Sequence, residues 1–186
     1  MANPHFQSMI TFAGNTVPTK HKKDLPMFQQ YASDQTFYGY SNDFFTYTAG
    51  DWTITSTDGG TDSGEVIGTT SSAGGALIIT TNDADNDSEE LQLKGEAFKL
   101  STSKRAYFSA RFKLSDATES DMKIGLAITD TTAIDGVSDG VFFTKDDDDT
   151  NLDFVIEKDG TETETTAVAT MADDTFVTAT WFIDPD

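Results

Sequence analysis

The chain has 186 residues, with 32 acidic side chains, 12 basic side chains and no cysteine, and its formal net charge is −20. This length is enough for one domain with a buried core. The lack of cysteine excludes disulfides and cysteine-based metal or nucleophile chemistry. Neither nucleic acid nor an anionic membrane surface is expected as a partner, because clustered lysine and arginine recognise both. No apolar run approaches the roughly 20 residues of a membrane-spanning helix.

The first 43 residues differ from the rest of the chain in charge and pattern. Three lysines balance three aspartates there, namely Lys20, Lys22, Lys23, Asp24, Asp34 and Asp43. The whole excess of negative charge therefore lies in residues 44–186. Three of the four prolines also fall in the first stretch, and no periodic pattern persists through it. We predict an extended N-terminal arm over residues 1–43, with at most a short helix near 24–31.

Residues 44–186 are rich in strand patterns. Apolar and polar residues alternate most clearly in 52–55, 106–114, 122–128 and 152–156. In 175–183 both faces are partly apolar, which is typical of a central strand. Weaker patterns predict strands at 44–48, 64–69, 76–81, 89–93, 96–101, 140–145 and 163–170. Glycine-containing turns such as Asp159-Gly160 separate them. The pattern predicts an all-β domain over 44–186, an antiparallel β-sandwich or jelly roll.

Six segments, taken in order, carry a resemblance to a known family. They are NDFFTYTAGDW (42–52), TTNDADNDS (80–88), KGEAF (94–98), FSARFKLSDAT (108–118), GLAITDTT (125–132) and DGVFFTKDD (139–147). The stretch 44–183 resembles tailed-phage virion proteins with a concanavalin A-like (lectin/glucanase) jelly roll. The resemblance implies a non-enzymatic head or tail component, of the capsid decoration or cement type, on the outer surface of the virion. It also implies that the β domain is incomplete at its C-terminus, because such proteins continue with further strands.

The arm carries the residues expected to bind a partner. Apolar side chains without a sheet to cover stand beside a lysine cluster: Phe6, Met9, Ile10, Phe12, Lys20, Lys22 and Lys23. Apolar residues on an extended arm often add to the surface of a partner. We predict that the arm anchors the domain to the major capsid protein or to sister subunits, as a homo-oligomer or bound to the lattice. The alternative is that the lysines form an exposed, solubilising cluster.

Two other binding sites fit the sequence less well. A carbohydrate-binding module or adhesin on the particle is the alternative function, with Tyr38 and Tyr40 stacking on sugar rings. Ca²⁺ is the one possible cofactor, because carboxylates alternate at Asp83, Asp85 and Asp87. The EF-hand pattern requires glycine at the sixth position and glutamate at the twelfth, where this chain has Ser88 and Lys94. The alternative is a solvated acidic loop.

The sequence does not favour an enzyme. Glucanases of this fold place their catalytic carboxylates on one strand as Glu-x-Asp followed by a second Glu, whereas this chain has Asn151 in the first position. Glu157 then lies four residues after Asp153. Both acidic side chains alternate with Leu152, Phe154 and Ile156, so a solvent-facing strand surface explains them. The only histidines, His5 and His21, lie in the arm without a nucleophilic triad around them.

Overall fold

The computed structural model describes residues 39–57, 63–68, 75–82, 87–95, 98–101 and 105–184. Contacts divide the chain between Asn42 and Asp43, and every described strand belongs to the second unit. The predicted arm over 1–43 lies almost entirely outside the described residues, including the short helix predicted near 24–31. In the described ranges there is no helix long and apolar enough to cross a membrane.

The described residues form one 3₁₀ turn and ten strands. They are η2 (Ala49–Asp51), β1 (Trp52–Thr57), β2 (Gly64–Ile67), β3 (Leu77–Thr80), β4 (Ser88–Leu93), β5 (Ala106–Phe112), β6 (Met122–Ala127), β7 (Gly140–Lys145), β8 (Asn151–Lys158), β9 (Thr161–Thr170) and β10 (Val177–Ile183). Every strand pairing is antiparallel. The prediction of an all-β, antiparallel domain is therefore confirmed.

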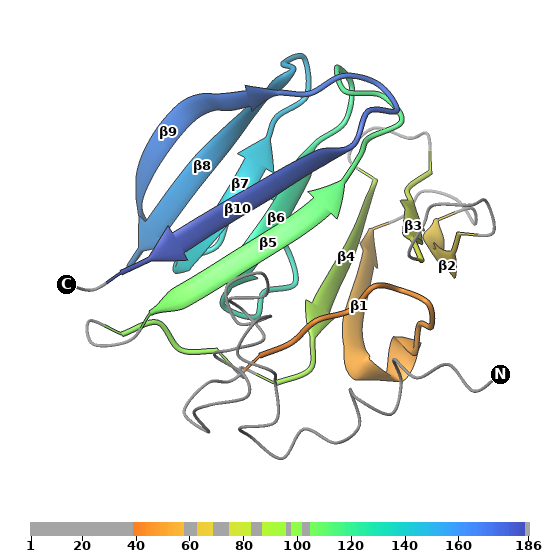
Figure 1. The fold of residues 1–186 in the computed structure, drawn as a ribbon, viewed down its shortest axis with the longest axis horizontal. Helices are drawn as coiled ribbons and strands as arrows, with labels where there is room; N and C mark the ends of the chain where they lie inside the picture. The colour runs from red at the N-terminus through yellow and green to blue at the C-terminus, as the bar shows by residue number, and fades with distance from the viewer. Residues whose placement is uncertain are drawn as a thin grey trace, which may run out of the picture. The chain divides into compact units, whose positions relative to one another are not determined.

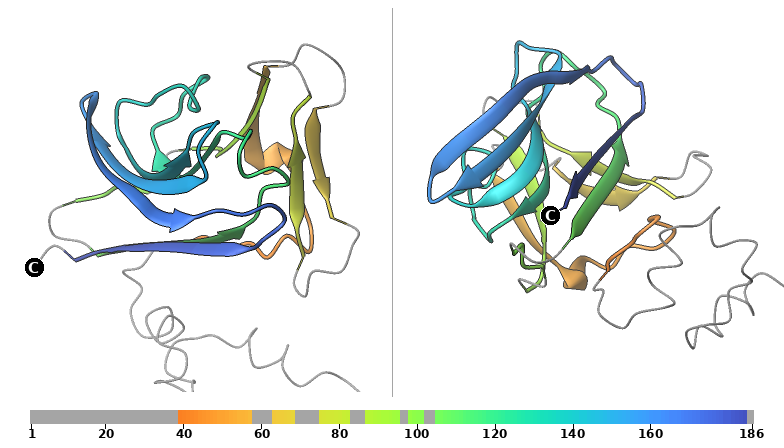
Figure 2. Two further views of the ribbon diagram at one scale, coloured as in Figure 1. Left: turned by 90° about the horizontal axis from the view of Figure 1, so that it is seen from above. Right: turned by 60° about the vertical axis from the view of Figure 1, so that its left-hand side comes forward.

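The strands form one sheet of four strands and three pairs. The four-stranded sheet has the order β6-β7-β8-β9, and the pairs are β5–β10, β1–β4 and β2–β3. Figure 1 shows the β5–β10 pair lying across one face of the four-stranded sheet, with β1–β4 and β2–β3 to one side. The two layers are seen from the edge in Figure 2. This packing of one sheet on another is the arrangement of a β-sandwich.

The main core lies between these two layers. Inward-facing side chains of β5 and β10 alternate with exposed ones, as period-two strands require. Trp181 stacks on its cross-strand neighbour Phe108 with ring centroids 5.7 Å apart. They join a buried cluster that includes Phe143 and Leu152 from the opposite sheet and Met171 from the β9–β10 connection. Residues from both layers thus share one apolar interior.

A second, smaller cluster covers the other face of the four-stranded sheet. Phe142 and Val155 are buried there against Val137, which lies in the loop between β6 and β7. The loop lies on the opposite side of the sheet from β5–β10 in Figure 2. The sequence predicted only a solvated surface on this side of β8, and that prediction is wrong at Val155 because the loop excludes water from it.

Three strand predictions need correction. Residues 44–48 are not a strand, because Phe44 has a φ of +50° and interrupts the extended conformation. Residues 98–101 form no strand either, and their apolar side chains Phe98 and Leu100 are exposed. Among the described residues β10 pairs only with β5, so it is not a central strand. The Asp159-Gly160 hairpin is confirmed, with a positive φ at both residues as a type I′ turn requires.

Lys145 is the only buried charged side chain among the described residues, with 1% of its surface exposed. Its ammonium donates hydrogen bonds to the carbonyl oxygens of Ser120 at 2.6 Å, Asp146 at 2.8 Å and Thr118 at 3.5 Å. Lys145 ends β7, so these bonds fasten the loop before β6 to the β7–β8 hairpin. The buried ammonium is tolerated because main-chain dipoles replace its hydration shell.

We predict that Lys145→Met destabilises the fold by about 3 kcal/mol, because it leaves buried carbonyl groups without a hydrogen-bond donor. Urea unfolding followed by circular dichroism measures the change. Lys158→Met is the matched control, because the ion pairs of Lys158 with Asp139 and Asp159 lie at the surface and should contribute little. Equal effects of the two substitutions would contradict this role of Lys145.

Candidate functional site

Most of the residues predicted to bind a partner, a sugar or a metal lie outside the described residues. This holds for all seven arm residues: Phe6, Met9, Ile10, Phe12, Lys20, Lys22 and Lys23. It holds also for Tyr38, Asp83 and Asp85. Tyr40 is described, with 48% of its surface exposed, and its hydroxyl accepts a hydrogen bond from the Asn42 amide at 3.2 Å. The predicted sites therefore stay predictions.

Asp87, the third residue of the predicted calcium loop, immediately precedes β4 and is half-buried. In the part of the chain that the structure describes, no group of three or more His, Asp or Glu side chains is placed to hold a metal ion. With Asp83 and Asp85 outside these ranges, calcium binding at this loop is left as a prediction.

A tyrosine on the approach to β1 lies among carboxylates. The hydroxyl of Tyr47 is shielded from solvent, and Glu65 of β2 and Glu89 of β4 lie near it. Burial raises the pKa of Tyr47 to about 12, and the nearby negative charges of Glu65 and Glu89 contribute to the shift. Glu89 also accepts a hydrogen bond from the Ser56 hydroxyl across the β1–β4 pair. This group keeps a neutral hydroxyl between two charged side chains.

Two polar side chains of β4 hold the loop that covers the second cluster. The Glu90 carboxylate accepts hydrogen bonds from the backbone amides of Ala133 and Ile134, both at 3.1 Å. Gln92 accepts a bond from the Asp130 amide at 3.2 Å and donates to the Ile128 carbonyl at 3.4 Å. These bonds tie the β1–β4 pair to the four-stranded sheet. Nothing in the local sequence of β4 indicated this, because the partners lie about forty residues away.

The carboxylates compared with glucanase catalytic residues lie on β8. Asp153 accepts a hydrogen bond from the Ala167 amide at 2.6 Å. Ala167 has a φ of +55°, and the β8–β9 register shifts between Leu152 and Phe154. Asp153 thus satisfies the main chain at a β-bulge, which is a structural use of its charge. Glu157 lies opposite Glu162 in the same strand pair.

Glu164 shares this acidic surface. It lies opposite Val155 in the β8–β9 pair. Loss of hydration raises the pKa of Glu164, and the negative charges of Asp153 and Glu162 raise it further. The ionised form is therefore less favourable in the folded chain than in the unfolded chain.

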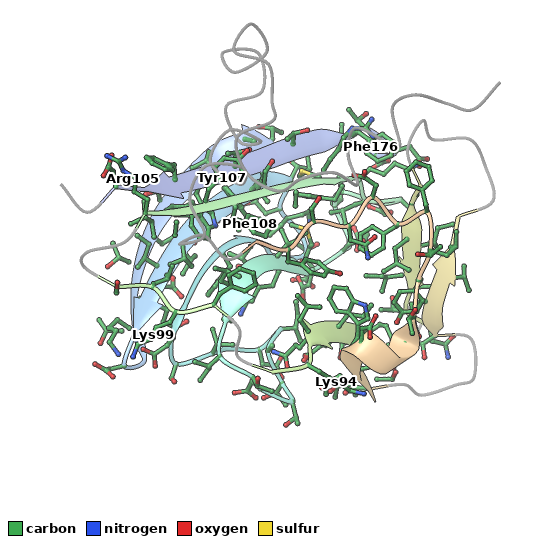
Figure 3. All side chains as sticks on the ribbon, turned by 60° about the horizontal axis from the view of Figure 1, so that its bottom comes forward. Lys94, Lys99, Arg105, Tyr107, Phe108 and Phe176 are labelled. Carbon is green, nitrogen blue, oxygen red and sulfur yellow. The ribbon has the colours of Figure 1, made fainter. Side chains whose placement is uncertain are left out.

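The outward surface of the β5–β10 pair, here called the outer β5–β10 face, joins the polar face predicted for the strand 106–114 to outward side chains of 175–183, a pairing that the sequence did not predict. Its side chains are Tyr107, Ser109, Arg111, Lys113, Phe176, Thr178, Thr180 and Phe182. Tyr107 and Phe182 are cross-strand neighbours and are 47% and 57% exposed. Arg105 and Tyr107 lie toward one end of the strand pair and Phe176 toward the other (Figure 3).

Polar contacts fix the rest of this face. The hydroxyls of Ser109 and Thr180 are hydrogen-bonded at 3.0 Å. Arg105 forms an ion pair with Asp184 at 3.1 Å, and the Arg111 guanidinium lies 3.7 Å from the ring centroid of Phe176. The apolar residues on both faces of 175–183 were the sequence signal for this surface. They were interpreted as the mark of a central strand, whereas Phe182 is in fact exposed.

We predict that the tyrosinate absorbance of the folded chain contains an ionisation step near pH 12 that Tyr47→Phe removes. Since the pKa rises from 10.0 to about 12 on folding, this hydroxyl contributes stability that is lost as the pH rises between these values. Tyr107→Phe should leave the step in place. Persistence of the step in Tyr47→Phe would assign it to another tyrosine.

We also predict that Glu164→Gln raises the melting temperature at pH 7, because it removes a charge that the fold disfavours. Because the pKa is raised above its ordinary value of 4.5, the penalty is complete above the raised pKa, fades as the pH falls through it and is absent below 4.5. The gain should therefore vanish near pH 4. Glu119→Gln, in the loop before β6, serves as the control, and a gain at pH 7 that persists undiminished near pH 4 would rule out the electrostatic explanation.

Comparison of the chain with protein families, with curated proteins and with solved structures finds no match in any of the three.

Proposed function

We propose that the protein is a non-enzymatic structural protein of a phage virion, which decorates or cements the outer surface of the capsid. In this proposal residues 44–186 form a concanavalin A-like jelly roll, and residues 1–43 attach it to the major capsid protein or to sister subunits. The six ordered segments that resemble phage virion proteins support it. The antiparallel two-layer arrangement agrees with that family's fold class.

The observation that carries the proposal is the division of charge along the chain. The arm is neutral and carries the lysine cluster, whereas the remaining residues hold the entire net charge of −20. Like charge keeps such domains apart in solution and on a crowded surface. An arm with no net charge is free of that repulsion, so it is the part of the chain best suited to dock.

The use of polar side chains in the β unit supports a role without catalysis. Glu90 holds a loop through two backbone amides, and Asp153 holds the β-bulge of β9. Lys145 binds three carbonyl oxygens. Catalytic carboxylates and lysines must meet a substrate, while these three side chains each satisfy the main chain.

Deletion of residues 1–20 should abolish incorporation into particles while the β unit keeps its thermal melt. The reason is that the deletion removes the apolar anchor but no described strand. Copy number on purified particles, measured by quantitative mass spectrometry and electron microscopy, gives the result. Lys20→Glu, Lys22→Glu and Lys23→Glu together should reduce occupancy, whereas Lys94→Glu in the β unit should not. Normal occupancy of the deleted chain on particles would refute the proposal.

A further inference from the structure

The described residues between 44 and 95, here called the N-terminal subdomain, carry β1, β2, β3 and β4 but take no part in either buried cluster. The main cluster is built from residue 106 onward and the smaller one from residue 128 onward. None of the described residues between 39 and 101 is buried. Apolar burial, the main source of stability in a folded chain, therefore holds β5 to β10 together, here called the sandwich, and contributes little to the attachment of the subdomain.

The β1–β4 pair turns its polar face toward the sandwich. Thr53 lies opposite Gln92 and Thr55 opposite Glu90 in the strand register. Glu90 and Gln92 bond to the loop between β6 and β7, so this face of the pair meets the sandwich. Because side chains alternate along a strand, the opposite face carries the apolar residues Trp52, Ile54, Leu91 and Leu93. The contact with the sandwich is therefore polar.

The apolar face of the β1–β4 pair belongs to the packing of the subdomain itself. Glu89 projects from that face, and together with Glu65 of β2 it lies near Tyr47. Gly75, just before β3, packs so closely on Phe44 that an added Cβ would overlap the Phe44 carbonyl group. Figure 1 shows the β1–β4 pair between β2–β3 and the sandwich. The subdomain thus has internal contacts that do not involve the sandwich.

Four hydrogen bonds join the two parts, and two side chains of β4 make them. Glu90 accepts two bonds from backbone amides of the β6–β7 loop, and Gln92 accepts one and donates one. Each such bond is replaced by a bond to water when the parts separate, so its net contribution to stability is small. In the connection between Leu93, which ends β4, and Ala106, which begins β5, the described residues form no strand.

We propose that the N-terminal subdomain opens from the sandwich as a unit while the sandwich stays folded, and that Glu90 and Gln92 hold it closed. Segments with few buried apolar contacts open at a lower free energy than the whole chain unfolds. The subdomain follows the arm in the sequence, so this opening places a movable element between the arm and the sandwich. The proposal goes beyond the virion role and does not depend on it.

Native-state hydrogen exchange of the full chain, followed by two-dimensional NMR at low urea concentrations, tests the proposal. We expect the amides of β1 and β4 to exchange through a shared opening, about 100-fold or more faster than those of β7, β8 and β10. Exchange in β1 and β4 should also depend less steeply on urea, because the opening exposes less surface than global unfolding does.

The β6–β7 loop contains its own control. The amides of Ala133 and Ile134 should exchange together with those of β4, because their acceptor, the Glu90 carboxylate, leaves with the subdomain. The amide of Ile128 bonds instead to the Asp139 carbonyl at 3.1 Å within the sandwich. Its exchange should therefore stay as slow as that of the sandwich strands.

A double variant tests the role of the two β4 side chains. Glu90→Thr combined with Gln92→Thr removes the four bonds and keeps strand propensity. It should raise the exchange rates in β1 and β4 about tenfold or more and leave those in β7 and β8 unchanged. Glu162→Thr makes the same substitution at an exposed position of β9 and should leave exchange in β1 and β4 unaltered.

Three outcomes would overturn the proposal. They are exchange of all strands through one common unfolding in the unaltered chain, unchanged exchange of β1 and β4 in the double variant, and an equal rise in every strand of that variant. The measurement on the unaltered chain decides the first point even if the double variant does not fold. Particle incorporation enters none of these measurements, so failure here and failure of the virion role are distinguishable.

Discussion

The fold depends on the packing of the β5–β10 pair against the inner face of the four-stranded sheet. A two-stranded pair alone is marginally stable in water, and Trp181 and Phe108 stabilise this one only when the opposite sheet covers them. Burial of a large apolar side chain contributes roughly 2–3 kcal/mol. The same interior holds Ala117 and Met171 from two connections, so the loops at the sandwich edge are positioned by this contact as well.

The abundant carboxylates also stabilise the fold, because they accept hydrogen bonds from backbone amides in the connections between strands. Hydrogen bonds from the amides of Glu119 and Thr118 lower the pKa of Asp116. Asp173 accepts a bond from the amide of the buried residue Ala117 at 2.8 Å. Turns of an acidic chain can thus be ordered without basic partners, because the N–H groups of the main chain supply the positive dipoles that these two aspartates bind. Carboxylates that lie close together also repel one another, as Asp153 and Glu162 do with Glu164.

Strand positions were largely predictable, because they follow from alternation within a few neighbouring residues. The strand over 140–145 and the Asp159-Gly160 hairpin were predicted with their observed bounds. The contacts between sheets were not, because Glu90 and Gln92 act on a loop about forty residues away. The apolar pattern of 175–183 was seen but misinterpreted, since a sequence cannot distinguish a strand covered on both faces from one that exposes Phe182. Residue patterns likewise gave no sign of the conformation of Phe44.

The long-range pairing of β5 with β10 also imposes an order on folding. Ser109 and Thr180, which meet in this pair, are 71 residues apart in the chain, whereas β7, β8 and β9 are joined by short hairpins. Hairpins between neighbouring strands form quickly. Strands that are far apart in the sequence pair more slowly, because bringing them together costs more chain entropy. During synthesis β5 must therefore remain without its partner until β10 has left the ribosome. Over that interval the inner face of the sheet is exposed, and the negative charge of the chain is the property that opposes aggregation of nascent copies.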